Sequence, residues 1–407
     1  MKKVISALAM AALVAGGAFA LDITGQIHSG VTLLQGDDVD NSDVVTGGHV
    51  GRFRLQASAE NEEGTFGAWM RLNAVHNDMG TDAASFDVTG HAWWRPTDMF
   101  WMAIGTNPDG FFNAEGRTGW QFYQAAGDAR VANAGNFTGL GGYAGFDLQG
   151  DMALIRTRDA FFSGFGSANM RAGEYDVMGA EWGLAFTISP LEMLNINIGI
   201  PFITGYYGFS REAGDVFSAL TAQVELNLDF GRIAITYDGH RADDGAIFAY
   251  FGMGDDEDDL RLDIGVSFHL YEEDSNLGTH GDMGSMIYVG LGVGANITDD
   301  FGLRARAVAG FGTGDYAPFG MLLDLLPFFS ISDNLTAFVS LGMSMFAQDD
   351  WEDSVFDWHL NPYIQVSAGP ASFFAGVRLW STSTMDATYS VSSTFNWAIP
   401  IGITINF

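Results

Sequence analysis

Three arginines on two predicted neighbouring strands are the side chains of this chain best placed to do chemistry. Arg52, Arg54 and Arg71 share one face of these segments, because side chains alternate in direction along a β-strand. A four-residue turn at 61–64 would place Arg54 opposite Arg71, and two such guanidinium groups repel each other unless anions or carboxylates lie nearby. We therefore expect either an electrostatic site that acts on charged solutes, or a hydrated wall on which these arginines pair with Glu60 and solvent.

Enzymatic and metal chemistry find little support in the sequence. The chain has no cysteine, and its eight histidines include no His-x-x-x-His pair on a predicted helix, so we expect no metal and no cofactor. No Gly-x-Ser-x-Gly elbow occurs between a predicted strand and a helix. His91, His240, His269 and Ser267 are the residues to suspect in a barrel-wall hydrolase, but isolated polar wall residues are the simpler interpretation. We expect no catalytic residues.

Strands must position the arginines, because alternation of apolar and polar side chains runs through most of the chain. The alternating runs are about 10–14 residues long, whereas strands of soluble proteins usually have five or six. They lie at 48–60, 191–203, 215–229, 259–272, 284–297, 301–311, 334–346 and 358–368. After residue 20 no apolar stretch approaches 18 residues, which excludes helical spans. A membrane protein without such helices must close a sheet to satisfy its backbone.

The two ends of the chain indicate where that sheet resides. The odd positions from Ile399 to Ile405 are all isoleucine, and the last residue is Phe407. This segment resembles the terminal strand of bacterial outer-membrane β-barrels, which implies that Phe407 is a C-terminal signal for the barrel-assembly machinery. Residues 1–20 have the charged, apolar and small-x-small order of a signal peptide, so we expect the mature barrel to span 21–407.

The connections between strands predict the topology. Short turns and long polar connections alternate, as they do between the two rims of outer-membrane barrels. Counting from residue 21, every short turn follows an even strand, provided that 245–254 is also a strand. We therefore predict an all-β, transmembrane, antiparallel up-and-down barrel of about 18 strands, within a range of 16–20. The turn Trp93-Trp94-Arg95-Pro96-x-Asp98 also resembles one in spirochaetal porin-like proteins.

Residues 107–174 form a long irregular segment between the fifth and sixth predicted strands. In its position and its mixed charge the segment resembles the loop of general porins that folds into the lumen and narrows the pore. The resemblance implies that Asp109, Glu115 and Asp128 face the three arginines across a constriction. Two additional strands within this segment, giving a 20-stranded barrel, are the alternative.

The charge balance restricts the partners. The chain carries 50 acidic and 18 basic residues, for a net charge of −32, which makes it a poor ligand for nucleic acid. Runs of acids such as 255–259 and 349–353 are typical of solvated loops, and the overall charge favours cations at the pore mouths. The expected partners are outer-membrane lipids, the assembly machinery and small hydrophilic solutes, with a homotrimer as a further expectation drawn from general porins.

The function that we expect is passive diffusion of small hydrophilic solutes and ions through an outer-membrane porin. The alternative is a substrate-specific uptake channel, in which the inward aromatic residues Trp93, Tyr288, Tyr363 and Trp380 would form a track for a sugar. An outer-membrane hydrolase is the third candidate. Saturable flux would distinguish the second function from the first.

Overall fold

The computed structural model consists of β-strands and the short turns between them in all the parts of the chain that it describes. These are residues 19–37, 49–77, 84–106, 182–201, 221–238, 246–254, 259–269, 286–313, 319–347, 354–385 and 391–407. Residues 1–18 and the whole of 107–174 therefore lie outside the described residues. Within the described parts, no helix is long and apolar enough to cross a membrane.

Within the described ranges, nineteen strands make up one sheet, and each pairs antiparallel with its neighbours. The strands of the first half are β1 (Phe19–Asp37), β2 (His49–Asn61), β3 (Phe66–Asn77), β4 (Ala84–Thr97), β5 (Phe100–Thr106), β6 (Trp182–Leu191), β7 (Leu194–Pro201), β8 (Thr221–Leu228) and β9 (Gly231–Asp238). Those of the second half are β10 (Ala246–Met253), β11 (Leu260–His269), β12 (Met286–Asn296), β13 (Phe301–Gly312), β14 (Phe319–Ser332), β15 (Leu335–Ala347), β16 (Val355–Ala368), β17 (Ala371–Gly376), β18 (Arg378–Met385) and β19 (Val391–Asn406).

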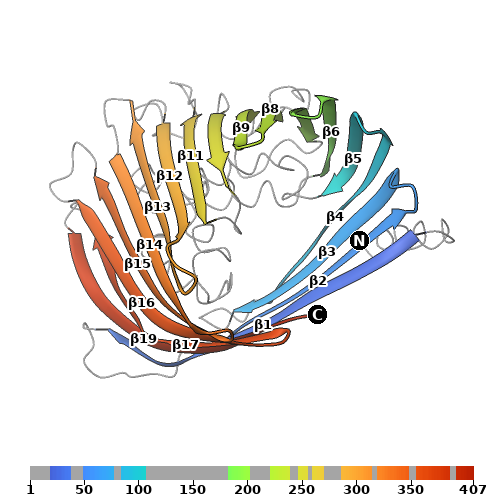
Figure 1. Ribbon diagram of the computed structural model, residues 1–407. Coiled ribbons are helices and arrows are strands. Elements are labelled where there is room, and N and C mark those ends of the chain that lie inside the picture. Colours follow the sequence, from blue (N-terminus) through green and yellow to red (C-terminus); the bar gives the residue numbers. More distant parts are fainter. Residues whose placement is uncertain are drawn as a thin grey trace.

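The sheet returns on itself. Strand β1 pairs with β2 at one edge and with β19 at the other, and every described strand has a hydrogen-bonded neighbour on both sides. Figure 1 shows the strands arranged around a common interior. The predicted antiparallel up-and-down order is confirmed, and the strand predicted at 245–254 is present as β10.

The nineteen strands form a wall that is eighteen strands wide. Strands β17 and β18 are two parts of one strand, since both pair with β16 on one side and with β19 on the other. Val377 separates them and donates its N–H to the carbonyl of Pro362 at 3.0 Å. Beside this break, Pro362 in β16 and Pro400 in β19 offer no N–H to the ladder. The predicted count of about 18 therefore agrees with the structure.

Strand β5 pairs directly with β6, from Phe100 opposite Ile188 to Thr106 opposite Trp182. This pairing leaves no place between β5 and β6 for the two additional strands that were the alternative for 107–174. The wall continues across this point, although 75 residues of sequence separate the two strands. Whether that segment enters the lumen is a question outside the described residues.

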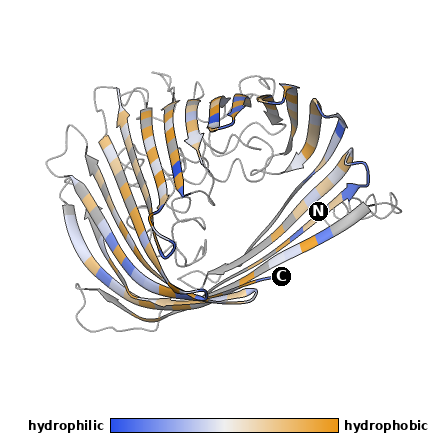
Figure 2. Cartoon of the chain, in the orientation of Figure 1, coloured by the Kyte–Doolittle hydropathy of each residue, from blue (hydrophilic) through white to orange (hydrophobic). Residues whose placement is uncertain are grey.

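The two faces of the wall differ in polarity. Along β9, Ile233 and Ile235 are 38% and 57% exposed, whereas Ala234 between them is 2% exposed. Large apolar side chains are exposed on nearly every strand, and Figure 2 shows apolar and polar residues alternating along the strands. A soluble protein would not leave so many large apolar side chains in water. The outer face is therefore the lipid-facing surface of a barrel, and the inner face is lined by polar and small side chains.

Exposed aromatic side chains lie near both rims of the wall. Those near the short turns are Phe66, Trp94, Phe230, Phe301, Phe329, Phe373 and Phe407, and those near the long connections are Phe311, Phe319, Phe356 and Phe395. Aromatic residues at strand ends form the girdles that mark membrane–water interfaces in barrels. Trp93, expected to point inward, borders an inner cavity, because it alternates with the outward Trp94.

Short hairpins follow β2, β4, β6, β8, β12, β14 and β16, as the topology predicted. The hairpin predicted at Ser189-Pro190 is instead formed by Glu192 and Met193. Pro190 lies within β6, at a register shift between Ile188 and Leu191, because a bulge tolerates a residue without an N–H group.

The seam between β1 and β19 ends at Phe407. Phe407 and Gly25 exchange both backbone hydrogen bonds, at 2.6 and 2.9 Å. The Phe407 ring covers Gly25 so closely that a Cβ atom there would overlap it. Phe407 thus closes the last rung of the ring with its backbone and covers a glycine with its side chain.

Candidate functional site

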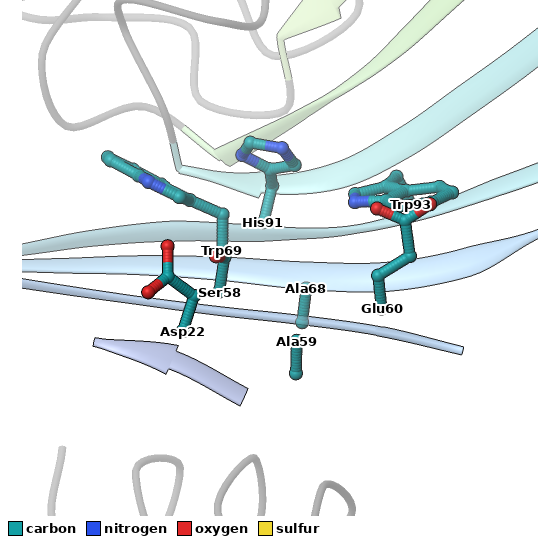
Figure 3. Close-up of a pocket in the computed structure, with 8 residues that line it drawn as sticks. All are labelled: Asp22, Ser58, Ala59, Glu60, Ala68, Trp69, His91 and Trp93. Atoms are coloured by element: carbon teal, nitrogen blue, oxygen red, sulfur yellow. The ribbon is translucent and has the colours of Figure 1, made fainter. Parts of the chain in front are cut away.

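Four polar and aromatic residues form one row across the inner face of neighbouring strands. Asp22 of β1 pairs in register with Ser58 of β2, Ser58 with Trp69 of β3, and Trp69 with His91 of β4. Because directly opposed residues point to the same face of a sheet, the four side chains lie side by side. Figure 3 shows Asp22, Trp69 and His91 rising from the same side of the sheet.

A second row lies one step nearer the short turns. Glu60 of β2 pairs with Gly67 of β3, and Gly67 pairs with Trp93 of β4. The Trp93 indole lies over Gly67, where a Cβ atom would overlap the ring. The glycine therefore makes the room in which the indole lies flat against the wall.

The two rows border a cavity of about 410 Å³. Its lining consists of Asp22, Ser58, Ala59, Glu60, Ala68, Trp69, His91 and Trp93 (Figure 3). Two of these eight residues are carboxylates, and none is lysine or arginine. Both acidic residues are exposed, and neither carboxylate has a hydrogen bond or an ion pair to another described residue. Among its described lining residues, the cavity thus presents two carboxylates beside two indole rings.

The aromatic rings of the site contact one another. The Trp69 and His91 ring centroids are 5.8 Å apart at an interplanar angle of 30°, and His91 meets Trp101 edge-on at 6.4 Å. On the neighbouring row, the Cζ atom of Arg95 lies 5.5 Å from the centroid of the Trp93 ring. Such contacts fix the orientation of the rings in advance of any ligand.

The wall formed by β6, β7 and β8 carries a different polar arrangement. The Thr187 hydroxyl donates to Asn197 Oδ1 at 2.8 Å, and Asn197 Nδ2 donates to Gln223 Oε1 at 2.8 Å. Gln223 is 2% exposed. This rung satisfies its amide groups within the wall itself.

A parallel rung ends on Glu225. Ser189 donates to Asn195 at 2.7 Å, and Glu225 Oε1 accepts from Asn195 at 3.2 Å and from Asn227 at 2.9 Å. Arg232 Nη1 lies 3.7 Å from Glu225 Oε2, and the Glu225 side chain is 3% exposed. The carboxylate is therefore buried and paired with a cation, and its hydrogen bonds are all made by Oε1, because the buried Oε2 has no hydrogen-bond partner.

The predicted opposition of Arg54 and Arg71 is wrong. Arg54 pairs with Asn73, and Arg71 pairs with Gln56, so the two arginines are offset by two positions. Arg52 pairs with Val75 on the same two strands. The side chains of all three arginines lie outside the described part of the structure, as do Asp109, Glu115 and Asp128.

Asn61 explains the offset. Its side-chain Oδ1 accepts the N–H groups of Thr65 and Phe66, each at 2.8 Å, and its Nδ2 donates to the Thr65 hydroxyl at 3.0 Å. Gly64 adopts a φ of 66° within the turn and donates to the Asn61 carbonyl at 2.9 Å. These bonds make Asn61 and Phe66 the ends of the hairpin loop, which shifts the register by two residues from the predicted turn at 61–64.

The four residues expected to form an aromatic track for a sugar differ in their surroundings where the structure describes them. Tyr363 is 4% exposed and stacks on Phe338, with ring centroids 4.8 Å apart and an interplanar angle of 6°. Trp380 is also buried. Trp93 does border the cavity, while the Tyr288 side chain lies outside the described residues.

The sequence reasoning missed Asp22 and Trp69 as site residues. Trp69 lies two residues before Arg71 on the same strand, so the alternation that placed Arg71 on the inner face also places Trp69 there. Asp22 falls two residues after the predicted cleavage point, where no strand pattern singled it out. His91 was noticed only as a possible catalytic residue.

The register argues against hydrolytic chemistry in this cavity. Ser58 and His91 are two strands apart, with Trp69 between them, so they do not form a nucleophile–base pair. Among the described residues, no three histidine, aspartate or glutamate side chains gather as a metal site.

Comparisons with known proteins bear on the fold. No protein-family model matches the sequence, and no curated protein sequence matches it. OpdK of Pseudomonas aeruginosa, an outer-membrane protein solved with vanillate, matches with a TM-score of 0.51 at 10% identity, over 95% of this chain and 99% of that one. The outer-membrane channel DcaP of Acinetobacter baumannii matches with a TM-score of 0.50 at 9% identity, over 96% of this chain and 98% of that one. The chain therefore has the fold of the bacterial outer-membrane β-barrels to which these channels belong.

Proposed function

We propose that this protein is an outer-membrane porin, a water-filled channel for passive diffusion of small hydrophilic solutes and ions. The observation that carries the proposal is the polarity of the ring of strands, which is apolar outside and polar inside. An eighteen-stranded ring is wide enough to hold water between its walls. The resemblance to two outer-membrane barrels supports the same location for this chain.

A liposome-swelling assay tests this function. Purified, refolded protein in liposomes should admit small neutral sugars at rates that fall steeply with solute size and do not saturate with concentration. Liposomes prepared with heat-unfolded protein are the control. Equal, slow rates in both preparations would contradict the proposal.

The predicted charge constriction remains part of this proposal. Arg52, Arg54 and Arg71 would supply the positive side of a transverse field, and Asp109, Glu115 and Asp128 would supply the negative side. Replacing the three arginines with glutamine should shift the reversal potential in a KCl gradient towards stronger cation preference, because fixed charges near the narrowest point weigh most on permeant ions. An unchanged reversal potential would remove these residues from the constriction.

The roles proposed for the two chain ends also have direct tests. Cleavage after Ala20 would keep the pairing of β1 with β2 from Leu21 onwards. N-terminal sequencing of the exported protein would then begin at Leu21. Deleting Phe407 should impair membrane assembly, because this residue supplies the last rung of the β1–β19 seam. A homotrimer would be detected by light scattering in detergent.

A substrate-specific channel is the second candidate, and one observation favours it. The cavity between β1 and β4 holds indole rings and carboxylates that no general diffusion pore requires. Flux of a recognised solute would then saturate, whereas general diffusion would not. For hydrolysis, the third function considered, the described residues of this cavity offer no nucleophile–base pair.

A further inference from the structure

We propose that the cavity lined by Asp22, Glu60, Trp69 and Trp93 is a binding site for small organic cations, solutes that carry a guanidinium or alkylammonium group. The cavity would hold such a solute at the inner wall, close to the short-turn rim, during its passage. This inference rests on the proposed channel function, because the solute reaches the site through the lumen.

The negative charge of the lining indicates that the ligand is positively charged. Glu60 and Asp22 lie on adjacent strands, where Ala20 pairs with Glu60 and Asp22 pairs with Ser58. Both carboxylates face the same cavity, and none of the described residues that line it is an arginine or a lysine. Two carboxylates that share a site repel each other, and a bound cation relieves that repulsion. A carboxylate or phosphate solute would add to it.

The indole rings give the organic character of the ligand. A cation over the face of a tryptophan is attracted by the ring quadrupole at distances up to about 6 Å. Arg95 already places its guanidinium carbon 5.5 Å from the Trp93 centroid, which shows that this ring accepts such a group. Trp69 lies one row further along β3 and is held by its contact with His91. An inorganic ion would gain little from these surfaces, whereas a guanidinium gains from both ring and carboxylate.

The size of the cavity fits one small solute. Its volume of about 410 Å³ is within the range of roughly 300–1,000 Å³ usual for small-molecule sites. A neutral sugar could stack on the same rings, but it would leave the two negative charges uncompensated. We therefore expect organic cations to bind more tightly than neutral sugars of the same size.

Glu225 is an example of a carboxylate in this chain that is buried and held by other residues of the wall. Its carboxylate is 3% exposed, accepts two amide hydrogen bonds and lies 3.7 Å from Arg232. Glu60 and Asp22 have no such partners among the described residues, and both are exposed. The wall of β1–β4 thus keeps available the charge that the wall of β6–β9 neutralises.

The test is block of single-channel current by three solutes: agmatine, which carries a guanidinium and an amine, anionic glutarate, which is similar to agmatine in size, and maltose, a larger neutral sugar. The full-length protein is measured in planar bilayers at low ionic strength, because screening weakens charge recognition. Agmatine should reduce the current with a saturable concentration dependence, and maltose and glutarate should have little effect at the same concentrations.

Matched variants locate the block. Glu60→Gln should raise the half-blocking agmatine concentration about two- to fivefold, which corresponds to one exposed charge–charge contact. Glu62→Gln removes the same charge two residues away, outside the cavity, and should leave the block unchanged. Trp69→Leu should weaken it, and Trp69→Phe should restore part of it. Asp22→Asn is measured separately, because cleavage after Ala20 would place an α-ammonium group on the adjacent residue.

The outcomes separate this inference from the channel function. Channels that conduct but are blocked equally by maltose, or whose agmatine block is the same in Glu60→Gln and the parent protein, would overturn the cation site and leave the porin standing. Absence of conductance in the parent protein would overturn the porin instead. Should a variant fail to fold, titration of parent-protein tryptophan fluorescence decides: quenching by agmatine and not by maltose supports the site, and equal responses refute it.

Discussion

The β6–β9 wall and the β1–β4 wall both present polar side chains to the inside of the ring, and they use them differently. On β6–β9, the buried Glu225 accepts hydrogen bonds from Asn195 and Asn227 at Oε1, while its Oε2, which has no hydrogen bond, forms an ion pair with Arg232 at 3.7 Å. On β1–β4, Glu60 lies beside the rings of an open cavity with no described partner for its carboxylate.

The difference distinguishes polar side chains that stabilise the wall of a pore from polar side chains that remain available to a solute. A buried network in which every group is paired rigidifies the wall, and removing one member leaves the others unsatisfied. An exposed, unpartnered carboxylate contributes little to stability and remains available to a solute. Loss of a carboxylate should therefore lower the stability of the protein on the β6–β9 wall and weaken solute binding on the β1–β4 wall.

The largest expected effect is on the β6–β9 wall. Glu225→Ala should lower the free energy of unfolding by about 3 kcal/mol, because it leaves a cation and two amide donors without their shared acceptor. Guanidinium chloride unfolding in detergent, followed by tryptophan fluorescence, measures the loss. Asp229→Ala removes an acid from the adjacent turn and should change little. A Glu225→Ala protein as stable as its parent would break the comparison.

Gly67→Val should have the next largest effect. Its side chain would collide with the Trp93 indole, and overpacking of this kind costs about 2 kcal/mol. The same change should abolish agmatine block, since the ring must leave its position. Ala57→Val is the control, because Ala57 pairs with the outward Met70 on the lipid-facing side of the wall and does not line the cavity. Retention of both stability and block would mean that Trp93 does not need Gly67.

Asn61→Ala should cost about 1 kcal/mol, because it removes three side-chain hydrogen bonds from an exposed hairpin. The same unfolding measurement checks it. Loss of agmatine block in this variant, which lies outside the cavity lining, would show that the hairpin sets the register of the site. A stability equal to the parent would contradict the role given to Asn61.

The smallest expected effect on stability is that of Glu60→Gln, within about 0.5 kcal/mol of the parent. Its consequence should be functional, as a weaker agmatine block. Destabilisation of the size expected for Glu225→Ala would show that Glu60 belongs to the structure, and the two walls would then be alike.

Much of the fold could be predicted from alternation, because the period of two assigns every strand residue to a face. Together with the alternation of short and long connections, it predicted the strand β10, the order of the strands and their number, and it placed Trp93 on the inner face. Cross-strand register could not be obtained in this way. Arg54 pairs with Asn73 instead of Arg71, because the side-chain hydrogen bonds of Asn61 move the hairpin loop along the chain. The resulting two-residue shift in register leaves every side chain on its predicted face, so the alternation does not reveal it.

The site was harder to predict than the fold for the same reason. Asp22, Ser58, Trp69 and His91 become neighbours through three successive registers, and none of them lies near another in sequence. Which carboxylates find partners depends on those registers too, so composition could not distinguish Glu60 from Glu225.

Single-channel recording tests the central claim most directly, which is that the polar inner face encloses a water-filled pore. Protein that is folded, as judged by altered gel mobility before boiling, is added to a planar bilayer across a series of KCl concentrations. The structure predicts discrete, ohmic current steps whose conductance rises in proportion to the bulk conductivity. Folded protein that inserts into the bilayer and gives no such steps would contradict it.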